Sequence, residues 1–219
     1  MIYFRKCILV LIFFFFASNA WANIVQKLIE SNYIEIIRES SEQKWYVGTV
    51  IVSNNKLNII YESGAGESPT IMAYKKSDNR LELILKCLPL LSVRRFSESE
   101  MYIPVFYLLS FYLDNNEIKY ECNFIENPAS FIIGFTFNRC VIHERSAIVR
   151  AEPTTESEMV SILPQDYIVT VTSIGNDFYE IFRIKDYWLE INFAREMYGD
   201  TRFWIYGFYV RFPKEIILE

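Results

Sequence analysis

Short β-prone runs separated by polar turns dominate the first two thirds of the chain. Three turns rich in Asn and Asp lie between pairs of such runs: Ser53-Asn54-Asn55, Ser77-Asp78-Asn79 and Asp114-Asn115-Asn116. Asn and Asp tolerate the left-handed backbone that tight hairpins require. The recurrence of these turns predicts an antiparallel β meander that closes as a sandwich or a barrel.

The segment before the meander is less uniform. Ile24, Leu28 and Ile29 fit one face of a helix, whereas residues 33–37 fit a strand about as well. We expect a short helix followed by a strand.

The extreme N-terminus has the order of a secretory signal peptide. Arg5 and Lys6 precede the uncharged apolar run Ile8 to Ala17, and small residues at positions 20 and 22 follow it. A membrane anchor is the alternative, but a bilayer-spanning helix needs roughly 20 apolar residues and this run is about half as long. We expect cleavage after Ala22, no stable membrane span thereafter, and a periplasmic or secreted bacterial protein.

Charge excludes one class of partner. The whole chain has a net charge of −5, and removal of Arg5 and Lys6 leaves 20 basic against 27 acidic residues, a net charge of −7. Basic residues cluster no further than the pairs Lys75-Lys76 and Arg94-Arg95. Nucleic-acid binding relies on several clustered Lys and Arg side chains, so nucleic acid is not an expected partner. A cationic protein is compatible with this charge.

Three cysteines follow the signal peptide, in a compartment where disulfides persist. Cys122 and Cys140 lie in strand-like segments joined by a short connection, and we expect this pair to form a disulfide, with Cys87 as a buried thiol. A Cys87–Cys122 bridge is the main alternative, because connectivity does not follow from sequence alone.

Catalytic and metal-binding motifs are missing from the sequence. The one histidine, His143, has no cysteine, serine elbow or second histidine beside it, and no C-x-x-C spacing occurs. The many carboxylates leave a glycosidase-like pair open. We expect no enzyme activity, no metal and no cofactor.

The last third of the chain resembles a bacterial SH3 (SH3b) domain. The resemblance rests on four segments: Ala147 to Val160 with its V-R-x-x-P core, Ser161 to Val171, Phe178 to Ile181, and Phe203 to Val210. The usual Gly residues are replaced by Gln165-Asp166 and by Phe203, and residues 184–201 are longer than the family requires. The expected parts are a signal peptide over residues 1–22, an antiparallel β domain over 23–145, and a small SH3-like β-barrel over 146–219.

The resemblance implies recognition of peptidoglycan peptides or of an envelope protein. Tyr and Trp combine an apolar ring with a polar group, which suits short peptides. We expect Trp204 to belong mainly to the core and Tyr187 and Trp188 to be exposed. The candidate ligand-binding residues are Tyr179, Tyr187, Trp188, Trp204, Tyr206 and Tyr209.

Two functional hypotheses follow. The favoured one is an exported, non-catalytic binding protein that uses its SH3b-like part in the cell envelope. The alternative is a secreted or periplasmic inhibitor or immunity-type protein that blocks a cell-wall hydrolase, which the net charge of −7 would suit if that hydrolase is cationic.

Overall fold

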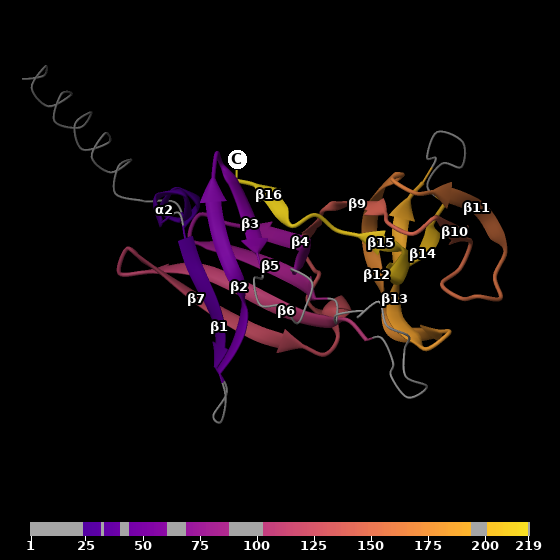
Figure 1. Ribbon diagram of the computed structural model, residues 1–219, viewed down its shortest axis with the longest axis horizontal. Coiled ribbons are helices and arrows are strands. Elements are labelled where there is room, and N and C mark those ends of the chain that lie inside the picture. Colours follow the sequence, from indigo (N-terminus) through magenta and orange to yellow (C-terminus); the bar gives the residue numbers. More distant parts are fainter. Residues whose placement is uncertain are drawn as a thin grey trace, which may run out of the picture.

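The structure is a computed structural model, and it describes residues 24–31, 33–39, 44–60, 69–87, 103–193 and 201–218. The predicted signal peptide, residues 1–22, lies outside the described residues. Strands account for 65% of the described residues and helices for 9%, in antiparallel sheets, so the mainly β class is confirmed. Figure 1 shows two sheets together in one part of the molecule and a third in the other.

The first sheet has four strands in the order β1-β2-β3-β16. It follows the helix α2 (Ile24–Ser31) and contains β1 (Tyr33–Glu39), β2 (Lys44–Ser53), β3 (Lys56–Ile60) and β16 (Glu215–Ile217). The expected short helix and following strand are therefore confirmed. Asn54 and Asn55 form the β2–β3 turn with φ of 51° and 59°, in the left-handed region that their side chains tolerate.

The second sheet has five strands in the order β7-β6-β5-β4-β8. Its strands are β4 (Thr70–Lys76), β5 (Arg80–Cys87), β6 (Val105–Asp114), β7 (Glu117–Ile125) and β8 (Thr136–Phe137). The hairpins β4–β5 and β6–β7 close at two of the Asn-containing turns in the sequence. The predicted antiparallel hairpins are thus present, but they are divided between two sheets and do not form a single meander.

These two sheets share one apolar core. Val50 and Leu57 from the first sheet, Leu83 and Leu109 from the second, and Leu28 from α2 are fully buried in it. Full burial of each such side chain contributes roughly 1.5–3 kcal/mol. The core therefore holds the helix and both sheets together.

The third sheet has seven strands in the order β11-β10-β14-β13-β12-β9-β15. Its strands are β9 (Arg139–Ile142), β10 (Ser146–Arg150), β11 (Met159–Pro164), β12 (Ile168–Ile181), β13 (Ile184–Asn192), β14 (Phe203–Tyr206) and β15 (Val210–Arg211). The 3-10 turn η1 (Pro128–Ser130) precedes it, and η2 (Gly207–Tyr209) lies between β14 and β15. In Figure 1 this sheet curls as a half-barrel. Its apolar core also contains Met72, Ile84 and Phe106 from the second sheet.

Strand pairings connect segments on opposite sides of the predicted boundary between residues 145 and 146. β9 precedes the boundary but pairs with β12 and β15 in the third sheet. β16 follows it but pairs with β3 in the first sheet, where Ile216 lies opposite Leu57. The division into residues 23–145 and 146–219 stays a prediction, and the chain is interwoven across it.

The structure contains neither the expected Cys122–Cys140 disulfide nor the alternative Cys87–Cys122 bridge, because none of these three cysteines is disulfide-bonded. Cys122 lies on β7 of the second sheet, whereas Cys140 is buried on β9 of the third, with its Sγ 3.7 Å from Val169 O. Burial raises the pKa of Cys87 and of Cys140 to about 12. The sequence suggested neighbouring strands, but the two cysteines belong to different sheets.

Candidate ligand pocket

Three of the six candidate aromatic residues are buried: Tyr187, Trp188 and Tyr206. Tyr187 is buried on β13, and its hydroxyl donates to Glu126 O at 3.2 Å. Tyr206 is buried on β14, and its hydroxyl lies 2.7 Å from Tyr179 O and 2.6 Å from Ile184 O. Burial raises the pKa of Tyr187 to about 12 and also raises the pKa of Tyr206. Both hydroxyls hold backbone segments together.

The expected exposure of Tyr187 and Trp188 is wrong. Both belong to β13, which lies between β12 and β14, and residues 186–189 are buried on both faces of that strand. The sequence had placed them in an insertion, but residues 184–192 form a central strand of the sheet. Their ligand-binding role stays a prediction.

The other three candidates are more accessible. The Tyr179 hydroxyl lies 3.3 Å from Thr155 Oγ1, and hydrogen bonds with Thr155 and Thr154 lower the pKa of Tyr179. Trp204 is half-buried on β14, so it is not a fully buried core residue. Tyr209 is half-buried in η2. Tyr179 thus ties the loop after β10 to the β12–β13 hairpin.

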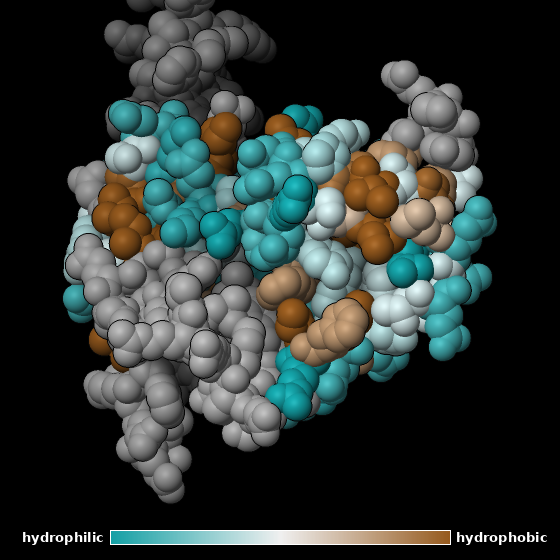
Figure 2. Space-filling model, turned by 45° about the vertical axis from the view of Figure 1, so that its right-hand side comes forward, coloured by the Kyte–Doolittle hydropathy of each residue, from teal (hydrophilic) through white to brown (hydrophobic). Residues whose placement is uncertain are grey.

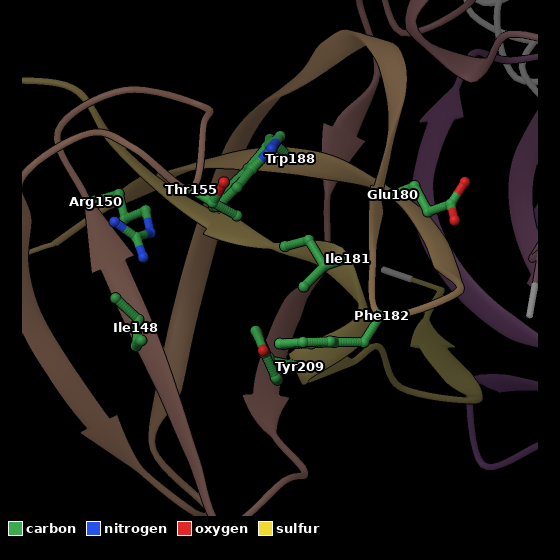
Figure 3. Close-up of a pocket in the computed structure, with 8 residues that line it drawn as sticks. All are labelled: Ile148, Arg150, Thr155, Glu180, Ile181, Phe182, Trp188 and Tyr209. Carbon is green, nitrogen blue, oxygen red and sulfur yellow. The ribbon is translucent and has the colours of Figure 1, made fainter.

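A pocket of about 380 Å³ lies between these elements. Figure 3 shows side chains converging on it from β10, from the loop after β10, from the β12–β13 hairpin, from β13 and from η2. Its lining comprises Ile148, Arg150, Thr155, Glu180, Ile181, Phe182, Trp188 and Tyr209. Trp188 and Tyr209 are therefore the predicted candidates that the structure brings together here, and Tyr179 contacts the same loop.

Trp188 carries a polar atom without a partner. Its side chain is packed against Tyr206 and Tyr179, with ring centroids 5.4 and 5.9 Å apart. Its Nε1 is buried and has no hydrogen-bond partner among the described residues. A buried donor left unsatisfied costs about 1–3 kcal/mol. Because protein atoms enclose this nitrogen, it is not accessible to a ligand in the pocket.

Arg150 supplies the positive charge of the pocket. It ends β10, where the register with β11 shifts between Val149 and Arg150. Its Nη1 donates to Ser157 O at 2.6 Å, which fixes the guanidinium against the loop after β10. A guanidinium has five N–H donors, so this bond leaves others to meet a ligand.

Phe182 forms part of the pocket lining at the tip of the β12–β13 hairpin. Ile181 pairs with Ile184, so Phe182 and Arg183 make a two-residue turn, with φ of 50° and 65°. This backbone is unfavourable for a bulky side chain, and Gly or Asn normally occupies it. Phe182 is also 94% exposed. A strained and exposed ring beside a pocket is a feature that a binding role would explain.

Sequence reasoning missed Arg150, Phe182 and the other lining residues outside the aromatic candidates. Phe182 does not look like a turn residue in the sequence, because Phe lacks turn chemistry, whereas Gly175-Asn176-Asp177 has the composition of a turn. In the structure residues 175–177 lie within β12, at an irregularity in its pairing with β13.

His143 lies outside the pocket. Its Nε2 lies 2.6 Å from Phe208 O, and Glu144 Oε1 is 3.5 Å from its Nδ1. Burial lowers the pKa of His143. Within the described parts of the chain, no group of three or more His, Cys, Asp or Glu side chains is placed to hold a metal ion.

The fold and the pocket define a mainly β protein with an aromatic-lined cavity on its half-barrel. Comparison with models of protein families finds no match, and comparisons with curated proteins and with solved structures find none either. Among the described residues, no helix has both the length and the apolar character needed to cross a membrane.

Proposed function

We propose that this chain is an exported, non-catalytic binding protein of the bacterial cell envelope. Its SH3b-like part, residues 146–219, holds a short peptide segment in the pocket beside Trp188. The peptide belongs to peptidoglycan or to a partner protein. The proposal rests on the signal-like N-terminus, the SH3b resemblance and the pocket chemistry taken together.

One observation carries the binding role: the lining of the pocket includes Phe182, a ring that is almost fully exposed and held on a strained turn. Peptides present backbone carbonyl acceptors at regular spacing, together with apolar side chains. Such a ligand would cover Phe182 and accept hydrogen bonds from Arg150 at the same time.

A pull-down on purified peptidoglycan and on immobilised envelope extract tests the proposal. The wild-type protein is compared with Trp188→Phe, which replaces the indole in the pocket wall with a smaller ring, and with Phe182→Ser, which removes the exposed ring. Ile168→Ser is the matched control, because Ile168 is 60% exposed on β12 but does not line the pocket.

We expect the wild type and Ile168→Ser to be retained on one of the two matrices and both pocket variants to be lost from it. Retention of all four proteins to the same degree would contradict a role for the pocket. No retention of the wild type on either matrix would contradict the proposed function. Turbidity loss of a cell-wall suspension on adding the protein would contradict its non-catalytic character.

A further inference from the structure

The pocket has two distinct sides. Arg150 contributes hydrogen-bond donors, and Ile148, Ile181 and Phe182 contribute apolar surface. We infer that the pocket binds the carboxylate-bearing end of a peptide, with the adjoining apolar side chain against Phe182. This inference rests on the proposed function and names the chemical class of its ligand.

The donors favour a carboxylate over a neutral acceptor. Arg150 carries a cationic guanidinium, which is held in place by its hydrogen bond to Ser157 O. Hydrogen bonds from a guanidinium to a carboxylate are roughly twice as strong as those between neutral groups. The second oxygen of the same carboxylate can accept from another N–H of the same guanidinium, which has five donors.

The one acidic residue in the lining does not cancel this charge. Glu180 Oε2 lies 3.9 Å from Lys185 Nζ, so its carboxylate already has a cationic neighbour. Figure 3 shows the Glu180 carboxylate directed away from Arg150. The side of the pocket near Arg150 therefore keeps a positive character.

The apolar side sets the second requirement. Phe182 is almost fully exposed, and Ile148 pairs across β10–β11 with Ile162, which is 54% exposed. An apolar ligand side chain would bury the surface of Phe182, which stabilises the complex by about 25 cal/mol for each Å² of apolar surface removed from water. On the face shown in Figure 2, apolar side chains occur in small groups among hydrophilic ones. Recognition by a pocket fits this surface better than docking of a broad apolar face.

Titration calorimetry with two short probes tests the inference. The probes are N-acetyl-Gly-Gly-Leu with a free C-terminal carboxylate and the same peptide as its C-terminal amide. We expect the acid to bind the wild-type protein at least roughly tenfold more tightly than the amide, since a hydrogen bond to a charged group contributes more than a neutral one.

Two variants locate the effect. Arg150→Gln should bring the acid to the affinity of the amide, while Arg150→Lys, which keeps the charge, should retain part of the preference. Arg139→Gln removes a charge on the exposed end of β9, outside the pocket, and should leave the preference unchanged. Thermal melting of each variant verifies that it is folded.

Equal affinity for acid and amide would overturn the inference, as would failure of both probes to bind a wild-type protein that peptidoglycan or extract retains. Neither outcome would contradict the proposed function. Acid-selective binding by a protein that neither matrix retains would support the ligand class and would count against the envelope role.

Discussion

Lys86 Nζ lies 2.6 Å from Asp186 Oδ2, and the two side chains are 4% and 1% exposed. The pair joins β5 of the second sheet to β13 of the third. Lys86 also donates to Gly207 O at 3.0 Å, and Asp186 Oδ1 accepts from Tyr187 N at 2.8 Å. Burial raises the pKa of Asp186, while the Lys86 charge acts in the opposite direction. The two halves of the molecule are thus connected through a buried ion pair.

Removing one partner of this pair should be costly. Lys86→Met leaves the Asp186 carboxylate buried without its counter-charge, so we expect a loss of about 3–5 kcal/mol in the free energy of unfolding. The double variant Lys86→Met/Asp186→Leu should lose much less, because no uncompensated charge remains. Urea unfolding of the three proteins measures both values. Equal losses in the single and double variants would contradict this account.

Gly207 should not tolerate a side chain. A Cβ at this position would lie 2.8 Å from Tyr187 O and 2.9 Å from Asp186 Oδ1, and the backbone carbonyl cannot turn aside. We expect Gly207→Ala to lose about 1–3 kcal/mol, the range for overpacking. Gly175→Ala is the control, since its nearest neighbour would be Trp188 O at 3.3 Å, and it should lose less. Chemical denaturation of both variants provides the comparison.

His143 should make stability depend on pH. Burial holds the pKa of His143 below its ordinary value of 6.5, and the charge of Arg211 adds to that lowering while Glu144 opposes it. The unfolded chain therefore takes up a proton at this residue before the folded protein does. Its stabilising contribution is complete above pH 6.5 and is lost as the pH falls through that value toward the folded-state pKa.

His143→Gln keeps an N–H near Phe208 O but does not titrate. Between pH 7.5 and pH 5 its melting temperature should fall less than that of the wild type. Because other titrating groups are common to both proteins, parallel pH profiles would show that His143 does not contribute.

A substitution at Phe182 in the β12–β13 turn should raise stability and weaken ligand binding. Asn tolerates the left-handed backbone at residue 182 better than Phe does, so Phe182→Asn should raise the free energy of unfolding by about 1 kcal/mol. The same variant should weaken binding of N-acetyl-Gly-Gly-Leu, because the exposed ring is gone. Thermal melting and calorimetry on one preparation test both effects. A variant that is less stable than the wild type would argue against strain at this turn.

Substitution of two adjacent residues tests whether the packing of β16 against the first sheet contributes to stability. Ile216 is 4% exposed on β16, whereas its neighbour Ile217 is 59% exposed. Ile216→Ala should lose about 2–5 kcal/mol, as other buried Ile truncations do, and Ile217→Ala should lose little. Urea unfolding distinguishes the two. Similar small losses would mean that β16 is not held by the core.

Local signals predicted the hairpins well, because their causes lie in neighbouring residues. Asn54-Asn55 and Asn115-Asn116 adopt positive φ. Asn tolerates this backbone conformation at little energetic cost, so the sequence pattern indicates the turn. The turn at Phe182 obeys no such rule, and tertiary contacts of the hairpin override its local preference. The pocket was therefore found only through its Trp188 and Tyr209 members.

Long-range pairings escaped prediction for a different reason. β16 is three residues long and carries no turn signal or alternation that would indicate a partner in the first sheet. β9 was grouped with the strands before it because it follows them directly in the chain. β9 pairs with β12, which comes later in the chain. The periodicity within a segment predicts its secondary structure but not which distant segment it pairs with.

The pairing of β16 with β3 also constrains how the protein is made. Lys56 Nζ and Glu215 Oε1, which lie 2.7 Å apart across these strands, are separated by 159 positions in the chain. A ribosome adds residue 56 long before residue 215, so one edge of β3 stays unpaired until β16 has been synthesised. During that interval a nascent chain would be vulnerable to strand exchange with another copy, and holdase chaperones would be its natural safeguard.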